Sequence, residues 1–280
     1  MKRIFISYGS GPFKLTLDRI GKEATKLNIF DSIILYTDND LPAIIKYSPL
    51  MNYDTGGGYW IWKPYIIWKT IQNFNSNDII VYADAGCRLH ESLEWFRYFE
   101  YLENYNTILF QYKDNVDYGW DEIYGCSSPK IKHWTKKTTL NYFDTMFRSK
   151  DWRDYNKLMA GLILCKGSQN ELIANWLDIS LLHPHLIMDP FGVEIENQES
   201  YFFKHRHDQS ILTPLGYYYN KKDSVLILPE ESEHKNAKSI ATTERLIIKE
   251  IPKISLKTKT ISLIKSIIGE GLYNFLHLRL

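Results

Sequence analysis

An acidic residue stands at the end of an apolar run in the first third of the chain. The run Asp78–Ala83 (DIIVYA) has the composition of a buried strand, and Asp84, Ala85 and Gly86 follow it. Ligands of open α/β sheets bind at the carboxyl ends of strands, where this carboxylate could hold a divalent cation on a diphosphate or accept a ribose hydroxyl. The two small residues would let a ligand approach the backbone. The alternative is that Asp84 caps a following helix.

A second group of polar side chains fills the segment 205–210. Its residues are His205, Arg206, His207, Asp208, Gln209 and Ser210. Imidazoles, a guanidinium, a carboxylate and an amide at this density could bind metal, bind phosphate or hydrogen-bond sugar hydroxyls. The structural alternative is a helix start with Asp208 as its N-cap. A four-histidine metal site that adds His183 and His185 is conceivable, but the sequence His-Pro-His indicates a loop.

Three consecutive glycines open a third candidate segment, 55–64 (TGGGYWIWKP). A glycine loop before a helix start can turn its backbone amides toward an anion, and Lys63 could supply the opposing charge. The spacing G-x-x-x-x-G-K-[ST] of a phosphate-binding loop is absent. The indoles of Trp60 and Trp62 could be platforms for sugar rings, and the alternative for each is core packing.

Apolar runs that resemble buried strands alternate with helical patterns, which predicts an α/β fold. The expected strands are 2–7, 32–37, 78–83, 107–111 and 160–165, and the expected helices are 14–27, 60–74, 91–103 and 169–182. Residues 112–155 show no clean period and are expected to be irregular. We expect one domain over residues 1–248 and a separate tail over 249–280.

Aromatic residues are unusually frequent in the chain. There are 8 Trp, 20 Tyr and 13 Phe among 280 residues, which is 15% and excludes intrinsic disorder. The net charge of +1 provides no global positive field, so nucleic-acid binding is not expected. Rings in the irregular segment become candidates for sugar contacts if they lie beside Asp84 and Asp208. These rings are Trp120, Tyr124, Trp134, Tyr142 and Trp152.

The cysteines and the chain ends indicate a cytoplasmic location. Cys87, Cys126 and Cys165 are odd in number and lack C-x-x-C spacing, which predicts free thiols in a reducing compartment. Residues 2–7 are strand-like and no signal sequence precedes them, so secretion is not expected. No stretch of about 18 uncharged apolar residues predicts a transmembrane helix.

The tail has a different composition from the rest of the chain. Residues 249–280 hold six Lys or Arg and two Glu, and their apolar residues largely recur at helical spacing. A basic amphipathic helix of this kind can lie on the inner face of the cytoplasmic membrane beside anionic lipids. The alternatives are a terminal helix docked on the domain and half of a dimer contact.

Three segments together resemble motifs of bacterial glycosyltransferases of the GT-A fold, of the polysaccharide and lipopolysaccharide type. YADAG (82–86) is similar to the strand-end D-x-D motif of glycogenin-like enzymes, MAGLILCKGS (159–168) to their NSGVLLI strand, and HDQS (207–210) to their later DQ segment. GYWIWKPYII (58–67) together with YADAG resembles an uncharacterised bacterial branch. The resemblance covers about residues 1–215. It implies a Rossmann-like mixed sheet flanked by helices.

The resemblance also implies roles for individual residues. Asp208 and Gln209 would be the catalytic pair near the anomeric carbon of the donor sugar, and Gly161, with Ala160, would line the sugar pocket. Ser7, Tyr8 and Gly9 follow the first strand, where the family binds the nucleobase. The donor-binding residues implied are Ser7, Tyr8, Gly9, Lys63, Asp84, Ala85, Gly86, Gly161 and Arg206.

The sequence departs from the D-x-D motif at its second acidic position, which is Gly86. Either His207 and His234 complete a shell for Mn²⁺ or Mg²⁺ with Asp84, or the cation is held weakly or is not used. Without it, Lys63, Arg206 or Lys238 would have to neutralise the leaving diphosphate.

The expected reaction moves a hexose from a nucleotide diphosphate sugar, in the first place a UDP-sugar, to a hydroxyl of a cell-surface glycan or lipid-linked glycan. The glycogenin-like resemblance favours retention of the anomeric configuration. Two other classes stay open. A lectin-like module without catalysis would account for the aromatic residues, and a metal-dependent phosphohydrolase would use the segment His205–Asp208.

Overall fold

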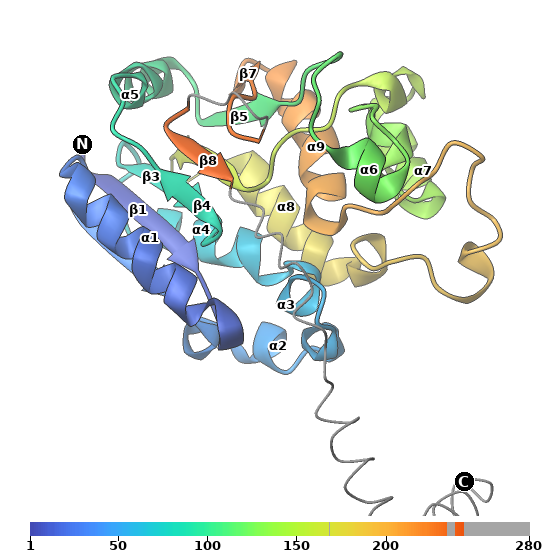
Figure 1. Cartoon of the computed structure of the whole chain (residues 1–280), viewed down its shortest axis with the longest axis horizontal. Coiled ribbons are helices and arrows are strands. Elements are labelled where there is room, and N and C mark those ends of the chain that lie inside the picture. The colour runs from blue at the N-terminus through green and yellow to red at the C-terminus, as the bar shows by residue number, and fades with distance from the viewer. Residues whose placement is uncertain (168, 234–238, 244–280) are drawn as a thin grey trace, which may run out of the picture. The chain divides into compact units, whose positions relative to one another are not determined.

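A mixed sheet of six strands forms the centre of the domain in the computed structural model, which describes residues 1–167, 169–233 and 239–243 (Figure 1). The strand order is β2-β1-β3-β6-β5-β7. Their bounds are β1 Arg3–Tyr8, β2 Ser32–Tyr36, β3 Ile79–Ala83, β5 Thr107–Gln111, β6 Leu162–Lys166 and β7 Val225–Pro229. Strand β6 runs antiparallel to β3 and β5, and the other neighbouring pairs are parallel.

A second, two-stranded sheet lies next to the end of β3. It pairs β4 (Cys87–Leu89) with β8 (Ala241–Thr243) in antiparallel register, with Cys87 opposite Thr243 and Leu89 opposite Ala241. The last described residues of the chain therefore return to the backbone that directly follows Asp84.

Helices cover both faces of the main sheet. The longer ones are α1 Lys14–Leu27, α4 Trp62–Gln72, α5 Glu94–Asn104, α7 Lys137–Phe147, α8 Glu171–Leu182 and α9 His207–Asn220, and the short ones are α2 Ala43–Lys46, α3 Gly56–Tyr59 and α6 Trp120–Tyr124. Single 3₁₀ turns occupy Gly11–Phe13, Asp38–Asp40, Pro49–Asn52, Ile131–His133, Asp151–Asp154, Pro184–Leu186 and Gly192–Glu194. This confirms the predicted α/β fold with a mixed sheet flanked by helices.

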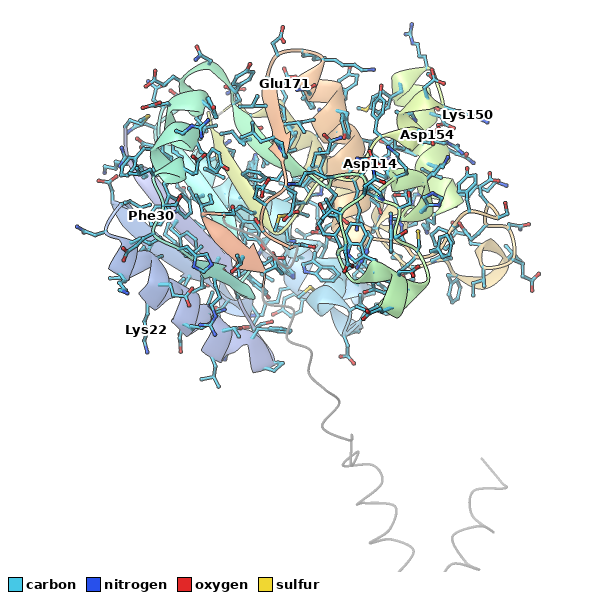
Figure 2. All side chains as sticks on the ribbon, turned by 45° about the horizontal axis from the view of Figure 1, so that its top comes forward. Lys22, Phe30, Asp114, Lys150, Asp154 and Glu171 are labelled. Carbon is cyan, nitrogen blue, oxygen red and sulfur yellow. The ribbon has the colours of Figure 1, made fainter. Side chains whose placement is uncertain are left out.

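The alternation of side chains along β1 divides the core into two clusters. Ile4 and Ile6 belong to the cluster that includes α4, α8 and α9, whereas Phe5 belongs to the cluster that includes α1 and α5. In the second cluster, the ring of Phe30 (labelled in Figure 2) lies 5.3 Å from that of Phe5 and 5.5 Å from that of Trp95. Both faces of the sheet are therefore buried, as parallel strands require.

Most predicted elements are present, with ends that shift by a few residues. The helix predicted over 14–27 has these bounds in the structure. The helix predicted over 60–74 begins at Trp62, because Tyr59 and Trp60 have positive φ angles of 57° and 59° and reverse the chain first. Strands β7 and β8 were not predicted, and neither was α7, whose first residue follows Lys136 without a side-chain cap.

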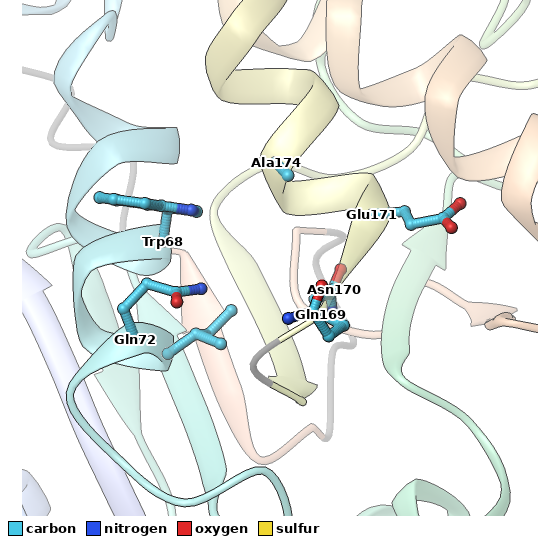
Figure 3. A pocket seen from close by; sticks show the side chains of 7 residues that line it. Trp68, Gln72, Gln169, Asn170, Glu171 and Ala174 are labelled. Atoms are coloured by element: carbon cyan, nitrogen blue, oxygen red, sulfur yellow. The ribbon is translucent and has the colours of Figure 1, made fainter.

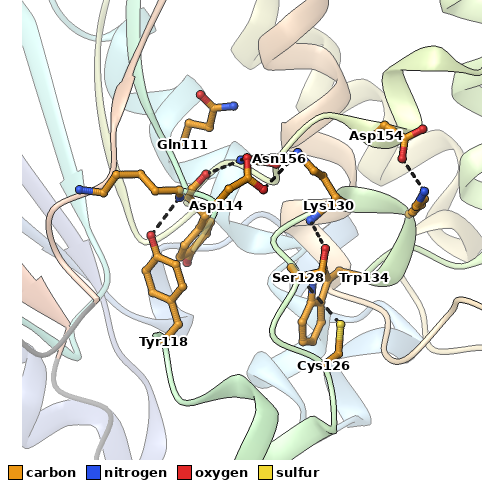
Figure 4. A network of polar contacts seen from close by, with 12 residues as sticks. Gln111, Asp114, Tyr118, Cys126, Ser128, Lys130, Trp134, Asp154 and Asn156 are labelled. Carbon is orange, nitrogen blue, oxygen red and sulfur yellow. Dashed lines mark hydrogen bonds and ion pairs between the residues drawn. The ribbon is translucent and has the colours of Figure 1, made fainter. Parts of the chain in front are cut away.

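The segment 112–155 is ordered by core packing and polar contacts and is not the ring-lined loop that the sequence suggested. Trp120, Trp134 and Trp152 are at most 1% exposed, so they belong to the core and cannot stack on a sugar. Figure 4 shows the polar contacts around Asp114, which receives hydrogen bonds from Asn156 at 3.1 Å and Lys130 at 3.3 Å.

The tail 249–280, its proposed amphipathic helix, His234 and Lys238 lie outside the described residues. Among the helices that are described, none has the length and apolar character needed to cross a membrane.

Candidate functional site

The carboxylates of Asp84 and Asp208 meet at a buried lysine. Lys63 Nζ lies 2.7 Å from Asp208 Oδ2 and 3.2 Å from Asp84 Oδ1. It also donates a hydrogen bond of 3.3 Å to the carbonyl of Ala160. The three segments that the sequence singled out, 55–64, 78–86 and 205–210, thus contribute one side chain each to a single ionic cluster.

Strands β3 and β6 position Asp84. Its backbone N–H donates a 2.8 Å hydrogen bond to the Gly161 carbonyl, and the Tyr82 hydroxyl donates a hydrogen bond to Asp84 Oδ1. A Cβ atom on Gly161 would lie 3.1 Å from Asp84 Oδ2, which is tighter than an ordinary contact. Gly161 therefore makes room for the carboxylate, and this is the contact that the structure gives to the predicted sugar-pocket glycine.

Asp208 lies in the first turn of α9. The helix begins at His207, and Arg206 occupies the N-cap position without a capping side-chain hydrogen bond, so the alternative that Asp208 is the N-cap is wrong. The helix N-terminus favours a carboxylate at this place. Gln209 anchors the same turn, because its Nε2 donates a 2.6 Å hydrogen bond to the carbonyl of Leu158.

The backbone after Asp84 does not enter a helix. It turns, with Cys87 N–H donating to the Asp84 carbonyl at 2.8 Å, and continues into β4, so the helix-capping alternative for Asp84 is also wrong. Arg19 from α1 holds this turn by donating hydrogen bonds of 2.7 Å to the carbonyl of Ala85 and 2.9 Å to that of Cys87. Ala85 is buried and Gly86 is half-buried.

Burial and charge act against each other in the cluster. Burial raises the pKa of Asp208, the charge of Lys63 opposes this rise, and the charge of Asp84 adds to it. Burial alone would lower the pKa of Lys63, but the attraction of Asp208 and Asp84 raises it above the ordinary value. Burial and the charge of Asp84 hold the pKa of Tyr82 well above its usual range, so its hydroxyl remains a donor.

Asp84 is the most exposed member of the cluster. Its side chain is 36% exposed, against 8% for Asp208 and 2% for Lys63. With two carboxylates and one ammonium, the cluster carries one net negative charge when all three groups are ionised. Its exposed side can therefore accept hydrogen bonds from hydroxyl groups or contact a cation.

The two histidines of the segment 205–210 are committed to protein contacts. His205 is buried; its Nδ1 accepts a hydrogen bond from the backbone N–H of Lys136, and its Nε2 contacts the Leu186 carbonyl at 2.9 Å. His207 Nδ1 lies 2.9 Å from the carbonyl of Ile187, and Nε2 faces the carboxylate of Asp189 at 3.8 Å. Burial lowers the pKa of both rings.

The expected metal centre does not fit the residues that the structure describes. Within them, no group of three or more His, Cys, Asp or Glu side chains could hold a metal ion, which also contradicts the four-histidine site. One oxygen of Asp84 is held by Lys63 and Tyr82, and both nitrogens of His207 face protein atoms. His234, the third proposed ligand, lies outside the described residues.

The glycine loop does not present its amides to an anion. The N–H of Gly57 donates to the carbonyl of Asp54 at 3.2 Å, and the N–H of Gly58 donates to that of Tyr53 at 3.0 Å. Both glycines have positive φ angles, 54° and 93°, which curl the loop back on itself. The prediction of an anion cradle here is therefore wrong for these two amides.

The loop predicts a difference between two glycine variants. A Cβ at Gly58 would lie 2.7 Å from Met51 Sδ and 3.2 Å from the Leu50 carbonyl, whereas a Cβ at Gly57 would meet no atom closer than 3.9 Å. We expect Gly58→Ala to lower the free energy of unfolding by about 2–3 kcal/mol. Gly57→Ala, which has the backbone strain alone, should cost about 1 kcal/mol. Urea unfolding measures both, and equal losses would contradict the proposed clash.

Trp60 and Trp62 have different surroundings. Trp62 is 5% exposed, stacks on Tyr8 at 3.9 Å between ring centroids and donates a hydrogen bond to the Gly56 carbonyl at 3.0 Å. It is a core residue, so its predicted role as a sugar platform is wrong. Trp60 is half-buried and stacks on His207 at 5.6 Å.

Ser7, Tyr8 and Gly9 are buried beneath the site and are not presented to a nucleobase. The Ser7 hydroxyl donates a 2.8 Å hydrogen bond to the Ala83 carbonyl, and the Gly9 N–H donates to Tyr36 at 3.1 Å. A Cβ on Gly9 would lie 2.9 Å from Leu17 Cβ. These residues pack β1 against its neighbours and support β3, which corrects the role that the resemblance implied.

Arg206 is half-buried and lies on aromatic rings. Its guanidinium carbon is 4.7 Å from the ring centroid of Tyr124 and 4.9 Å from that of Trp134. Its Nε is buried and has no hydrogen-bond acceptor within the described part of the chain. It is the remaining predicted donor-binding cation in the described part of the chain, since the Lys63 ammonium is enclosed.

Sequence reasoning missed two residues that shape the cluster, Tyr82 and Arg19, and it named Ala160 only as a lining residue of the sugar pocket. The period of two along a strand could have found Tyr82, because residues 82 and 84 share a face. No local signal identifies Arg19, which reaches the site from another element, or shows that the backbone carbonyl of Ala160 accepts a hydrogen bond from Lys63.

A cavity of about 260 Å³ lies between α4 and α8, away from the ionic cluster (Figure 3). Trp68, Gln72, Asn170 and Glu171 are among its lining residues. Because β6 is antiparallel to β3, Lys166 pairs with Ile79 at the start of β3, whereas Asp84 follows its end. The cavity is therefore near the amino end of β3, and the ionic cluster is at its carboxyl end.

Solved structures of several glycosyltransferases are similar to the chain at low sequence identity. Mouse xyloside xylosyltransferase 1 is 11% identical with a TM-score of 0.42, covering 81% of this chain and 85% of that one. A glycosyltransferase involved in glycosylating the major capsid of PBCV-1 is 9% identical with a TM-score of 0.43, covering 83% and 84%. A galactosyltransferase in complex with donor and acceptor sugar analogues is 12% identical with a TM-score of 0.38, covering 80% and 72%.

No model of a protein family matches the chain, and no curated protein matches it either. Because every TM-score above is below 0.5, the functional assignment rests on the residues of this chain.

Proposed function

We propose that the chain is a glycosyltransferase that moves a hexose from a nucleotide diphosphate sugar, in the first place a UDP-sugar, to a hydroxyl of a glycan. The observation that carries this proposal is the meeting of Asp84 and Asp208 at the Lys63 ammonium. These carboxylates come from the two motifs that resemble the D-x-D and DQ segments of GT-A enzymes. Asp84 directly follows β3, so the two carboxylates meet at the carboxyl end of this strand, where α/β sheets bind ligands.

The cluster provides groups suited to each part of this reaction. The bond between the anomeric carbon and the β-phosphate oxygen breaks, and its electron pair stays on that oxygen. The acceptor oxygen bonds to the anomeric carbon on the same face from which the β-phosphate oxygen departs, so configuration is retained, and its proton passes to Asp208, whose raised pKa suits a proton acceptor. Asp84, which is more exposed, accepts hydrogen bonds from sugar or ribose hydroxyls. Gln209 holds the turn that carries Asp208.

Further parts of the proposal concern the acceptor, the stereochemistry and the membrane. The acceptor is a cell-surface or lipid-linked glycan, transfer occurs with retention, and residues 249–280 attach the protein to the inner face of the cytoplasmic membrane. Trp60, which is half-buried on His207, remains the ring for contact with the acceptor sugar.

A thermal-shift screen with nucleotide diphosphate sugars, followed by an assay for glycoside formation, tests this function. A ligand that binds the folded state raises Tm, and the stabilisation grows with the logarithm of its concentration over Kd. We expect a shift with one class of nucleotide and formation of a glycoside from the matching sugar donor. A lectin would instead shift with glycans alone, and a phosphohydrolase would release phosphate or nucleotide and form no glycoside with any acceptor. Either result would overturn the proposal.

A further inference from the structure

When a nucleotide diphosphate leaves, positive charge is required near its oxygens. Because Gly86 replaces the second acidic residue of the D-x-D motif, the source of that charge is open. The sequence offers a divalent cation, Lys63, Arg206 and Lys238 as candidates. Lys238 lies outside the described residues, and the described side chains do not fit a metal centre. The two remaining candidates are Lys63 and Arg206, and their surroundings differ.

Lys63 cannot provide this charge directly to a ligand. Its ammonium has three N–H bonds, and three acceptors surround it: Asp208 at 2.7 Å, Asp84 at 3.2 Å and the Ala160 carbonyl at 3.3 Å. The side chain is 2% exposed. Its positive charge is more than balanced by the two carboxylates, so an incoming phosphate would meet a cluster of net negative charge.

Arg206 is in the opposite situation. Within the described residues no carboxylate forms an ion pair with its guanidinium, and its buried Nε has no acceptor. Its guanidinium carbon instead lies over the ring faces of Tyr124 and Trp134, at 4.7 and 4.9 Å from their centroids. A guanidinium that keeps its donors while rings hold its plane is prepared for an anion with several oxygens.

The rings that hold Arg206 are themselves fixed. Trp134 is buried, and its Nε1 donates a 2.7 Å hydrogen bond to the Ser128 carbonyl (Figure 4). Tyr124 packs edge-on against Trp134 with ring centroids 5.6 Å apart. The backbone N–H of Arg206 donates to the Trp134 carbonyl at 3.0 Å, which fixes the start of the turn that carries Asp208.

We propose that Arg206, held on Tyr124 and Trp134, binds the diphosphate of the donor and neutralises the charge of the leaving group, so that transfer needs no divalent cation. This inference rests on the proposed glycosyl transfer. Arg206 is two residues from Asp208, so one turn of chain carries both the proton acceptor and the cation for the leaving group. The electron pair released from the anomeric bond stays on the β-phosphate oxygen that Arg206 contacts.

The test measures the binding of UDP and of inorganic pyrophosphate by calorimetry in EDTA. Pyrophosphate reports the phosphate site whatever the base of the true donor is. We expect both probes to bind the wild-type protein in EDTA and to bind Arg206→Met about ten- to one-hundredfold more weakly, the loss for a charge-assisted hydrogen bond. Arg206→Lys should lose less, and Tyr124→Leu, which keeps the charge and removes one ring, should also lose less.

Lys222→Met is the matched control. The Lys222 ammonium also lies over a tyrosine ring, that of Tyr218 at 4.4 Å, but near the opposite end of α9. The affinity of the Lys222→Met variant for both probes should equal that of the wild type. Near-UV circular dichroism verifies the fold of each variant. If Arg206→Met unfolds, the affinity of Arg206→Lys for both probes is compared with that of the wild type instead.

Two outcomes would overturn the inference: unchanged affinity in the Arg206 variants, or binding that disappears in EDTA and returns with Mn²⁺. The proposed function fails in a different way. In that case pyrophosphate binding depends on Arg206, but no nucleotide sugar gives a glycoside with any acceptor.

Discussion

Lys63→Met should lower the free energy of unfolding by about 3–5 kcal/mol at neutral pH, the cost of breaking a buried ionic group by removing one partner. Methionine keeps most of the volume of the side chain but leaves Asp84 and Asp208 facing each other without the ammonium that lies between them. Urea unfolding of the variant and the wild type provides the measurement. A difference below about 1 kcal/mol would mean that the cluster adds little to the fold.

The loss should depend on pH in a defined direction. A carboxyl whose pKa is raised by folding favours the folded state most strongly below its unfolded pKa, and this contribution is lost as the pH rises through its folded pKa. Burial already raises the pKa of Asp208, and removing the opposing charge of Lys63 raises it further. The deficit of Lys63→Met should therefore shrink toward acid pH. Adding Asp208→Asn to Lys63→Met should recover part of the loss at neutral pH.

Asp208→Asn should reduce glycoside formation by about 10²–10⁴-fold, the range for a lost general acid or base, and leave the fold intact. The amide keeps the shape of the carboxylate but neither accepts the proton of the acceptor hydroxyl nor carries the charge that Lys63 stabilises. Asp84→Asn should also abolish most transfer, through loss of hydroxyl binding. Asp18→Asn, at an exposed position of α1, is the control and should keep the wild-type rate.

The pH profile distinguishes a proton acceptor from a residue that only holds the fold. Transfer by the wild type should fall as the pH drops through the raised pKa of Asp208, because the protonated carboxyl cannot accept another proton. The residual activity of Asp208→Asn should lack this acid limb. A rate near that of the wild type, or an unchanged acid limb in the variant, would remove Asp208 from the chemistry.

Much of the fold could be predicted because its elements obey local rules. The helix Lys14–Leu27 combines helical spacing of Leu17, Ile20 and Ala24 with a left-handed Asn28 at its end, and the structure has the predicted bounds. The strand before Asp84 is a run of buried apolar residues. By contrast, α7 has no capping side chain and contains two adjacent threonines, so its local signal is weak and tertiary packing determines it.

The residues of the site could be predicted from the sequence, but the contacts between them could not. Asp84, Asp208 and Lys63 stand out as polar residues beside strand or helix ends. Their contact joins residues far apart in the chain, and no spacing rule encodes it. Burial of Lys63 was equally invisible, since lysines are rarely buried without partners and the partners are distant in sequence. The same limit explains the mistaken roles of Ser7, Tyr8 and Trp62, whose burial depends on what packs over them.

The pairing of β4 with β8 has a consequence for the order of events during synthesis. The strand that follows Asp84 obtains its partner from residues 241–243, and Asp208 is also made late. A ribosome releases the chain from its N-terminus, so β1 to β3 can collapse long before either of these segments exists. The ionic cluster therefore closes only when nearly all of the described chain has emerged. Lys63 and Asp84 are synthesised before their third partner, Asp208. A nascent chain shorter than about 240 residues also lacks the strand that pairs with β4, so it cannot form the complete site.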